Sequence, residues 1–306
     1  MKVLVTGGSG LVGKHLKEKK PEWVYVSSKD YDLTRECYTR GMFYEIRPDA
    51  VVHLAAKTGG IKANAKNQEE FFYKNTMINT NVVKQAVEGK VPRLLAALST
   101  CAFPDTLQRY PFAERDIFSG PPAKTNFSYG YSKRMLHIQC MASREQHGLN
   151  YSTFAPSNLY GPGDNFDFET SHFVAAMIRK LHEAKNGDTI EFWGTGRPLR
   201  QQLYVDDLVN LIPILLERHN SADPIIVAPR QNLSIKEMVD TCLKISGKDV
   251  KYIFNGKLEG QHRKDGSNQK LLNLIGGLEF TTIEDGLGKT YEWYKRHQLK
   301  EKAKGR

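Results

Sequence analysis

Residues 3–13 have the sequence VLVTGGSGLVG, in which a short apolar run ends at a glycine-rich turn and an amphipathic stretch follows. Gly8, Gly10 and Gly13 have the spacing GxGxxG, and counting from Gly7 gives the spacing GxxGxxG. Glycines at these positions permit a tight turn and let the backbone approach a pyrophosphate at the start of a helix. Because the turn joins a strand pattern to a helix pattern, we predict a dinucleotide-binding loop.

The alternation of short apolar runs with longer amphipathic stretches continues through the first half of the chain. We expect strands at Lys2–Thr6, Trp23–Val26, Ala50–Leu54, Arg93–Leu98 and Tyr151–Ala155, and helices at Leu11–Lys19, Thr34–Ile46, Glu69–Glu88 and Tyr129–His147. Such alternation implies right-handed crossovers and a parallel sheet covered by helices on both faces. The predicted fold class is therefore α/β, a Rossmann-type doubly wound parallel sheet.

After Pro156 the rhythm changes to loops rich in Gly, Pro, Asn and Asp between isolated helices, expected at Ser171–Lys185 and Ser234–Ser246. Ser234 and Glu237 have the spacing of a capping box. We expect a smaller C-terminal α/β substrate lobe. We predict a dinucleotide-binding Rossmann domain over 1–156, to which residues 203–230 return with a strand at Ile225–Ala228. Residues 157–202 and 231–299 are predicted to form a substrate-binding lobe, and residues 300–306 a basic tail.

The 306 residues carry a formal net charge of +10, with 40% hydrophobic and 25% charged residues, the balance of an ordinary globular protein. A nucleic-acid-binding face would explain this charge, but no basic helix, Cys/His finger or aromatic RNA-binding motif stands out. A diphosphate-bearing cofactor and a diphosphate-bearing substrate explain it without nucleic acid. We expect the run Lys300, Lys302, Lys304 and Arg306 to form a frayed, solvated tail.

No stretch approaches the roughly 20 apolar residues that cross a bilayer, and the N-terminal run lacks the features of a signal peptide. The cysteines are widely spaced and have no CxxC pairing; they are Cys37, Cys101, Cys140 and Cys242. We therefore expect no membrane association, no metal site and no disulfide framework, and a location in the cytosol.

The second predicted strand ends in Ser27, Ser28 and Lys29. A fold that prefers NAD usually has an acidic residue at this point, where it binds the ribose 2′-hydroxyl. Hydroxyls and a cation suit a 2′-phosphate instead, so NADP(H) is the expected cofactor. Asp30 keeps NAD open, because a shift of a few residues in the register would place an acid at this tip.

Three residues have the order and spacing of a reductive site. Ser99 follows the strand pattern Arg93–Leu98, and Tyr129 and Lys133 form YxxxK on one face of a predicted helix. A nearby ammonium favours the tyrosinate, so we expect Lys133 to lower the pKa of Tyr129 towards neutrality. The phenol would exchange a proton with a carbonyl oxygen held by Ser99 while hydride is delivered to the carbon. YxxxK has little specificity alone and gains it from the glycine loop and the strand-end serine.

Five further segments are more diagnostic. They are Ala55–Asn64 (AAKTGGIKAN), Leu98–Pro104 (LSTCAFP), Asn158–Phe166 (NLYGPGDNF), Trp193–Gly196 (WGTG) leading to Arg200, and Tyr204–Asp207 (YVDD). On these residues the chain resembles the extended short-chain dehydrogenase/reductases and, among them, the GDP-L-fucose synthase family. The resemblance runs from Lys2 to about His297. The elements Gly-Gly-Ile-x-Ala-Asn and Ser-x-Cys-x-x-Pro distinguish that family from most relatives, including UDP-sugar 4-epimerases.

The resemblance implies an NADPH-dependent 3,5-epimerase/4-reductase that converts GDP-4-keto-6-deoxy-D-mannose to GDP-L-fucose. Cys101 and His172 would exchange the protons on C3 and C5, which the C4 ketone acidifies. A cysteine near a cation and a histidine can both exchange protons around pH 7. Cys37, Cys140 and Cys242 match no motif and are expected to be packing residues.

The resemblance also assigns the ligand contacts. Lys180 and Arg200 would neutralise the diphosphate of the GDP-sugar, Trp193 would offer an aromatic face, and Glu259 would contact the substrate. The cofactor-binding residues implied by the loop and the resemblance together are Gly7, Gly8, Ser9, Gly10, Leu11, Val12, Gly13, Ser28, Lys29, Leu54, Ala55, Ala56, Lys133, Pro156, Ser157, Asn158, Leu159 and His172.

Some residues depart from the family pattern. Ser157 stands where Thr is common, Gly163 where His is usual, and Glu259 where the family has Asp. These departures leave open a reductase-only or epimerase-only enzyme on a related GDP-keto-sugar such as a deoxy-heptose. The basic charge also leaves a cofactor-loaded redox sensor or nucleic-acid-binding regulator as an alternative, although a regulator has no need of the proton donor set.

Relatives use helices equivalent to Glu69–Glu88 and Tyr129–His147 for two-fold dimers, so we expect a homodimer.

Overall fold

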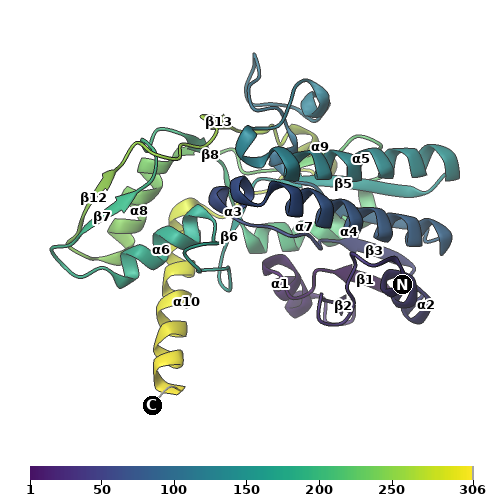
Figure 1. Cartoon of the computed structure of the whole chain (residues 1–306), viewed down its shortest axis with the longest axis horizontal. Helices are drawn as coiled ribbons and strands as arrows, with labels where there is room; N and C mark the ends of the chain where they lie inside the picture. Colours follow the sequence, from purple (N-terminus) through teal and green to yellow (C-terminus); the bar gives the residue numbers. More distant parts are fainter. Residues whose placement is uncertain (305–306) are drawn as a thin grey trace.

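The computed structural model describes the backbone of residues 1–304 and the side chains of residues 1–299. Figure 1 shows a broad block of helices around a central sheet, with a smaller group of elements beside it. The sheet is entirely parallel, and its strands in spatial order are β10 (Ile225–Val227), β5 (Asn150–Pro156), β4 (Arg93–Ala97), β3 (Ala50–His53), β1 (Val3–Thr6) and β2 (Val24–Val26). The predicted doubly wound parallel sheet is confirmed.

Helices cover both faces of this sheet. They are α1 (Leu11–Lys19), α2 (Glu36–Ile46), α4 (Gln68–Glu88), α5 (Phe127–His147), α7 (Val205–Arg218) and α9 (Gln269–Ile275). The short helix α3 (Ile61–Lys66) packs against α4 and the 3₁₀ turn Lys124–Asn126. One face packs against α2, α4 and α5, and the opposite face packs against α1, α7 and α9. Successive side chains of a strand point to opposite faces, so Leu4 belongs to the first core and Val3 and Val5 to the second. This explains why the strands are continuous apolar runs.

The smaller group is built from short strands and three helices around a third core. Its strands form three small sheets. The elements are β6 (Asn158–Tyr160), β7 (Thr189–Phe192), β8 (Leu199–Arg200), β9 (Gln202–Tyr204), β11 (Leu233–Ser234), β12 (Lys251–Phe254), β13 (Arg263–Lys264), α6 (Phe173–Glu183), α8 (Ile235–Ser246) and α10 (Ile283–Lys304). We call this group the small lobe.

The capping box at the start of α8 is confirmed. The Glu237 amide donates to Ser234 Oγ at 3.1 Å, and the Ser234 amide donates to Glu237 Oε2 at 2.7 Å. The helix predicted to begin at Thr34 begins two residues later, because Asp32 Oδ1 accepts bonds from the amide and the hydroxyl of Thr34 and holds a turn there. Local side-chain bonds therefore set both helix starts.

The expectation that three cysteines are packing residues is right for two of them. Cys140 and Cys242 are buried in separate cores, whereas Cys37 is exposed on the outer face of α2. The apolar spacing of α2 turns Met42 and Phe43 to the sheet and leaves Cys37 in solvent.

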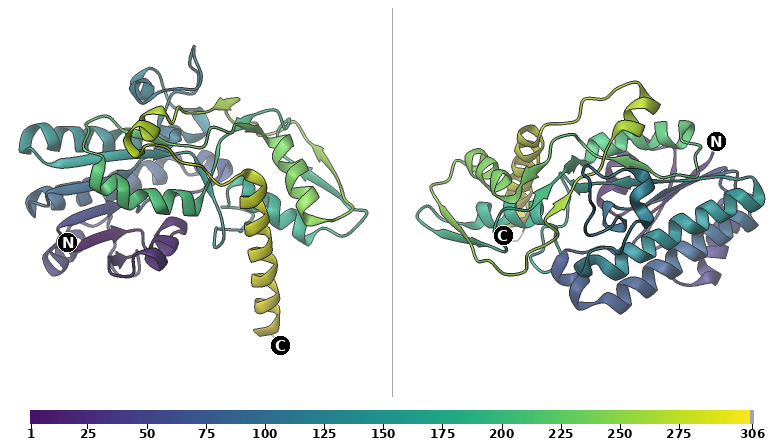
Figure 2. Two further views of the ribbon diagram at one scale, coloured as in Figure 1. Left: turned by 180° about the vertical axis from the view of Figure 1, so that it is seen from behind. Right: turned by 90° about the horizontal axis from the view of Figure 1, so that it is seen from above.

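The first half of the last helix, α10, packs in the core of the small lobe, and its C-terminal half extends beyond the other elements (Figure 2). The predicted frayed tail over 300–306 is helical as far as Lys304, and residues 305–306 lie outside the described part of the chain. Among the helices that the structure describes, none combines the length and the apolar character needed to span a membrane.

Candidate active site

A cavity of about 1240 Å³ lies along the carboxyl ends of the sheet strands and extends to the small lobe. Parallel sheets bind their ligands at this edge. Two predicted ligand-binding residues, Gly8 and Lys29, are not among the described residues that line it. The other predicted site residues line it; they are Gly7, Ser9, Gly10, Leu11, Val12, Gly13, Ser28, Leu54, Ala55, Ala56, Ser99, Cys101, Tyr129, Lys133, Pro156, Ser157, Asn158, Leu159, His172, Lys180, Trp193, Arg200 and Glu259.

The glycine loop leaves no room for side chains. Gly7 has φ +78°, and a Cβ on it would lie 2.8 Å from the Ala55 nitrogen. A Cβ on Gly13 would lie only 2.4 Å from the Gly7 carbonyl oxygen. Gly10, the residue before α1, has no side chain with which to cap the first amides of the helix. These amides and the positive end of the helix dipole are therefore available to an anion in the cavity.

Gly8 differs from the other glycines of the loop in its contacts. Its amide donates to the Val26 carbonyl at 2.8 Å, and a Cβ on it would lie 2.9 Å from Tyr25 Cβ. Gly8 therefore packs the loop against β2 rather than lining the cavity.

The tip of β2 presents hydroxyls to the cavity, because Ser27 and Ser28 line it. Asp30 bends back, and its Oδ2 accepts bonds of 2.8 Å from both the amide and the hydroxyl of Ser27. These bonds lower the pKa of Asp30, so its carboxylate stays charged and remains hydrogen-bonded to Ser27 within the turn. Lys29 is exposed beside this turn and is not among the described residues that line the cavity, so its contact with the cofactor stays a prediction.

Ser99, Tyr129 and Lys133 converge from two elements. Ser99 lies two residues after the end of β4, and Tyr129 and Lys133 lie one turn apart on α5. The buried Lys133 Nζ donates to the Ala97 carbonyl at 2.7 Å and lies 5.7 Å from the centroid of the Tyr129 ring. The spacing of the sequence motif thus places the three side chains on one wall of the cavity.

The predicted direction of the Tyr129 pKa is wrong for the free protein. Burial raises the pKa of the phenol, and the neighbouring Cys101 adds to this effect. Burial also lowers the pKa of Lys133, to about 8. Desolvation opposes both charged forms, and the Lys133 ammonium is bonded to a backbone carbonyl instead of the phenol oxygen. At neutral pH the phenol is protonated.

Cys101 and His172 lie on the cavity wall at the starts of two helical segments. Cys101 belongs to the 3₁₀ turn Thr100–Ala102, and its amide donates to Ser99 Oγ at 3.1 Å. His172 is the residue before α6. The Gly60 amide donates to the Thr170 carbonyl at 3.1 Å, so the Gly-Gly-Ile motif packs directly against the segment that carries His172. A Cβ on Gly60 would lie 2.5 Å from the Ser171 oxygen, which accounts for the glycine.

The surroundings lower the pKa of both residues. Burial alone would raise the pKa of Cys101, but the Lys264 ammonium, the Ser99 hydroxyl and the Arg200 guanidinium together bring it below its usual value. Desolvation and, second, the charge of Lys264 lower the pKa of His172. In the free protein the thiol is therefore acidified and the imidazole is neutral at pH 7.

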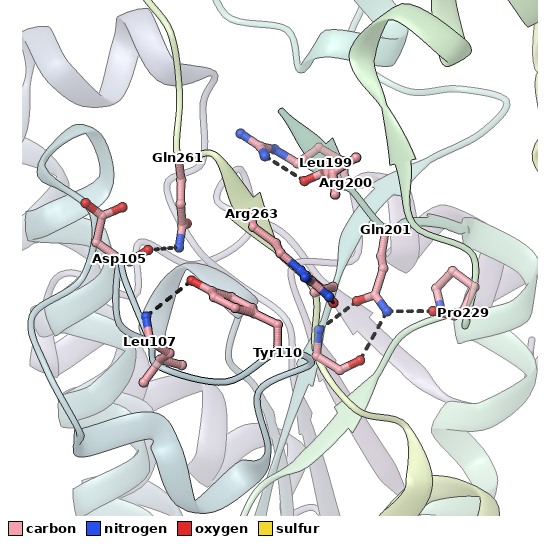
Figure 3. Close-up of polar contacts among 11 residues, drawn as sticks. Asp105, Leu107, Tyr110, Leu199, Arg200, Gln201, Pro229, Gln261 and Arg263 are labelled. Atoms are coloured by element: carbon pink, nitrogen blue, oxygen red, sulfur yellow. Dashed lines mark hydrogen bonds and ion pairs between the residues drawn. The ribbon is translucent and has the colours of Figure 1, made fainter. Parts of the chain in front are cut away.

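The predicted substrate residues line the part of the cavity next to the small lobe. Arg200, whose pKa burial lowers to about 10, donates to the Leu199 carbonyl at 2.7 Å (Figure 3). Lys180 donates to the Glu191 carbonyl at 2.6 Å, and burial lowers its pKa. Trp193 is 44% exposed, which leaves its indole ring available for stacking on a flat ligand.

Glu259 is tied to the segment that carries Trp193. Its Oε1 accepts bonds from the Thr195 amide at 2.9 Å and from the Thr195 hydroxyl at 2.6 Å. The Gly194 amide also donates to the Lys257 carbonyl at 2.7 Å. Glu259 therefore holds two loops together at the mouth of the cavity.

Ser157 offers an unsatisfied group on the sheet side. Its amide donates to the Val227 carbonyl at 2.9 Å, but its hydroxyl oxygen is buried and has no hydrogen-bond partner among the described residues. A buried hydroxyl without a partner is unfavourable unless a ligand satisfies it.

Lys264 is the residue that sequence reasoning missed. It is only 7% exposed, lines the cavity, and donates from Nζ to Cys101 Sγ at 2.9 Å. In the sequence it stands in an aperiodic polar run, 163 positions from its partner. The resemblance at Glu259, five residues earlier, was the one signal that pointed to this part of the chain.

Comparison with known proteins identifies the family of the chain. The NAD dependent epimerase/dehydratase family matches residues 3–228. The chain is 36% identical to a probable GDP-L-fucose synthase of Drosophila melanogaster, over 96% of this chain and 97% of that protein. It is 37% identical to the GDP-L-fucose synthase of Dictyostelium discoideum, over 95% and 94% of the two chains.

A solved structure gives the same result. The structure of a GDP-L-fucose synthetase from Naegleria fowleri bound to NADP superposes with a TM-score of 0.88 at 31% identity, and covers 97% of this chain and 93% of that one. The resemblance drawn from the sequence motifs is thereby confirmed. The chain belongs to the NAD dependent epimerase/dehydratase family and, within it, to the GDP-L-fucose synthase family.

Proposed function

We propose that the chain is an NADPH-dependent 3,5-epimerase/4-reductase that converts GDP-4-keto-6-deoxy-D-mannose to GDP-L-fucose. The observation that carries the proposal is that one cavity holds both a reductive set, Ser99, Tyr129 and Lys133, and an acidified thiol with a histidine, Cys101 and His172. Reduction of a ketone needs the first set, and proton exchange beside a ketone needs the second. Membership of the GDP-L-fucose synthase family supports the substrate.

The residues present fit a dinucleotide that carries a 2′-phosphate. Gly7 and Gly13 have no side chains to block the backbone, and the start of α1 can receive a pyrophosphate. The buried Ser157 hydroxyl has no hydrogen-bond partner among the described residues, and a bound cofactor could supply one. The carboxylate of Asp30 is engaged by Ser27, so the tip of β2 presents hydroxyls instead of an acid. When bound, the reduced nicotinamide supplies the hydride for C4.

Tyr129 is the proton donor for the new hydroxyl. The reductive direction needs a protonated phenol, and burial keeps Tyr129 in this form by raising its pKa. Ser99 holds the ketone oxygen, and the Lys133 charge stabilises the negative charge that develops on the phenol oxygen as its proton leaves. The raised pKa of Tyr129, which contradicts the simplest expectation from the motif, therefore suits a reductase.

Cys101 is the base of the epimerisation. Its lowered pKa favours the thiolate, which removes a proton from the carbon beside the ketone. His172 lies on the wall of the same cavity and protonates the other face. Burial and the charge of Lys264 lower the pKa of His172, so the imidazole is neutral in the free protein and must take up a proton from solvent before it acts as the acid.

The small lobe holds the GDP part of the substrate. Arg200 and Lys180 provide positive charge, and burial makes each charge costly unless an anion pairs with it. The exposed Trp193 provides a flat surface at the mouth of the cavity. The loops joined by Glu259 and Thr195 fix the position of this surface.

A count of incorporated deuterium tests the proposal. The protein is incubated in heavy water with NADPH and GDP-4-keto-6-deoxy-D-mannose, and the product is analysed by mass spectrometry. Two deuterons from solvent with NADPH oxidation support the dual activity. One deuteron indicates epimerisation at one carbon, none with NADPH oxidation indicates a reductase alone, and no turnover refutes the substrate.

The alternative of a related GDP-keto-sugar as substrate rests on two residues at the substrate side. A Cβ on Gly163 would meet no atom of the described residues within 4 Å, so the space of a larger side chain at this position is open. Glu259 is bonded to Thr195 rather than pointing freely into the cavity. A larger GDP-keto-sugar, such as a deoxy-heptose, is therefore the competing substrate in the same assay.

We also propose a homodimer and a location in the cytosol. Helices α4 and α5 lie side by side (Figure 2), and α5 carries partly exposed apolar residues at a spacing of three, Met135, Ile138 and Met141. Such a stripe on a long helix is typical of a two-fold interface. Sedimentation analysis should give a dimer, and Ile138→Glu should give a monomer with the same fold.

A further inference from the structure

Lys264 and Cys101 form a pair that the proposed mechanism does not yet explain. The Nζ of Lys264 donates to Cys101 Sγ at 2.9 Å, short for a bond to sulfur. A lysine that is 7% exposed is rare unless a partner compensates its charge. A neutral thiol is a weak acceptor, whereas a thiolate compensates the charge fully.

Hydrogen bonds fix the chain before and after Lys264, and Figure 3 shows those of Gln261 and Gln201. On one side, Gln261 Nε2 donates to the Asp105 carbonyl at 2.6 Å. On the other, Gln201 Oε1 accepts from the Gly266 amide at 2.9 Å, and its Nε2 donates to the Gly266 and Pro229 carbonyls at 3.1 and 2.8 Å. Between these ties, β13 pairs with β8 so that Lys264 lies beside Arg200. The position of the ammonium is therefore built into the fold.

The charged and titratable groups around Cys101 come from several elements. Lys264 on β13 and Arg200 on β8 are positive, the Ser99 hydroxyl follows β4, and the protonated Tyr129 faces the thiol from α5. No negatively charged side chain of the described residues acts on the thiol in this set. Lys264 also acts on the imidazole of His172.

We propose that Lys264 is a positioning residue that holds Cys101 as a thiolate aimed into the cavity, and so selects Cys101 as the base. This inference rests on the proposed function. In the step, the thiolate takes the proton from the carbon beside the ketone, the C–H electron pair moves into the carbon–carbon bond, and the carbonyl becomes an enolate. Lys264 keeps its protons throughout and ends next to a neutral thiol. His172, which must first take up a proton from solvent, then delivers that proton to the carbon, restores the ketone with the inverted centre and returns to the neutral imidazole.

The direct test measures the thiol without substrate or cofactor. In a Cys37→Ser background Cys101 is the accessible thiol, because Cys140 and Cys242 are buried. The rate of alkylation of Cys101 by iodoacetamide is followed against pH by peptide mass spectrometry. A free cysteine has a pKa of about 8.5. With Lys264 present, the midpoint should lie below this value.

Three variants separate charge from hydrogen bonding. Lys264→Gln keeps a donor without charge and should slow alkylation at pH 7 about tenfold, the effect of roughly one pKa unit. Lys264→Arg should restore the low midpoint, and the matched control Lys251→Met, an exposed lysine of β12, should leave it unchanged. Circular dichroism checks that each variant is folded, and Lys264→Met replaces Lys264→Gln if the latter does not fold. An equal midpoint in Lys264→Gln and the parent overturns the proposal.

The second test follows catalysis. Lys264→Gln should lose solvent deuterium incorporation at C3 and C5 about tenfold at pH 7 and recover it near pH 9, where the thiol ionises unaided. If Lys264→Gln and the parent protein show the same dependence of deuterium exchange on pH, the proposal is overturned. Failure of the parent protein to act on the GDP-keto-sugar concerns the proposed function alone, because the alkylation test needs no turnover.

Discussion

The Lys133 ammonium lies 5.7 Å from the centroid of the Tyr129 ring and donates its hydrogen bond to the Ala97 carbonyl instead of to the phenol. The pair is thus a buried cation beside a protonated acid, and not an ion pair. This arrangement suits proton donation. As the pH rises, the Lys133 ammonium loses its proton before the Tyr129 phenol does.

The pH dependence of reduction should report Lys133. Its pKa is lowered to about 8 by burial, whereas burial raises that of Tyr129, so the charge that assists proton donation is lost on the alkaline side before the phenol ionises. We expect kcat/KM for NADPH to fall above about pH 8, since this parameter reports groups of the free enzyme. Lys133→Arg keeps its charge and should move the fall beyond pH 9. An alkaline limb at the same pH in both proteins would contradict the assignment.

Removing the proton donor should abolish reduction. Tyr129→Phe should lower kcat for NADPH oxidation by roughly 10²–10⁴-fold, the usual contribution of general acid catalysis. Tyr131→Phe is the matched control, because Tyr131 packs edge-on against Phe127 at 4.7 Å and is not among the described residues that line the cavity. Stopped absorbance assays at 340 nm give both rates. Tyr129→Phe within threefold of the parent would refute the role.

Replacing the base should separate the two activities. A serine hydroxyl stays protonated at neutral pH, so Cys101→Ser should incorporate no deuterium at C3 or C5 and should still oxidise NADPH, giving the unepimerised product. Cys37→Ser, an exposed cysteine on α2, should behave like the parent. The products are distinguished by NMR. Full exchange in Cys101→Ser would exclude the thiol as the base.

The glycine loop can be tested through stability. Gly13→Ala places a methyl group 2.4 Å from the Gly7 oxygen and should lower the free energy of unfolding by about 1–3 kcal/mol and raise the KM for NADPH. Gly41→Ala, in the middle of α2 with open space around the new carbon, should stabilise by about 0.4–1 kcal/mol. Urea denaturation measures both. A stable Gly13→Ala protein with the KM of the parent would show that the loop has room to spare.

Coenzyme choice should depend on the tip of β2. Ser28→Asp places a negative charge where the 2′-phosphate is expected, and should raise the KM for NADPH at least about tenfold, or 1.4 kcal/mol, while improving use of NADH. Lys29→Met should change either KM less, because Lys29 points into solvent. The opposite order of effects would assign the 2′-phosphate to Lys29.

Features that depend on neighbours in the sequence could be predicted well. The glycine turn at Gly7–Gly13, the strand-end Ser99 and the one-turn spacing of Tyr129 and Lys133 follow from local periodicity, and the parallel sheet follows from their alternation. The start of α8 follows from its capping box.

Features that depend on burial and on distant pairing could not be predicted in the same way. The pKa of Tyr129 is set by desolvation, which a sequence motif does not contain. Lys264 reaches Cys101 only because β13 pairs with β8, a contact between short polar segments without a hydrophobic pattern. The bonds of Asp30 to Ser27, which keep this carboxylate within its own turn, are likewise absent from the residue pattern.

The position of β10 affects how the protein folds during translation. This strand pairs with β5 at the edge of the sheet, yet it is made after the chain has passed through much of the small lobe. While the ribosome is still synthesising residues before 225, the outer edge of β5 has no neighbour and can pair with strands of other nascent chains. We therefore expect the sheet to be completed late in translation. Until β10 has emerged from the ribosome, the nascent chain should need a chaperone that covers the edge of β5 and prevents aggregation.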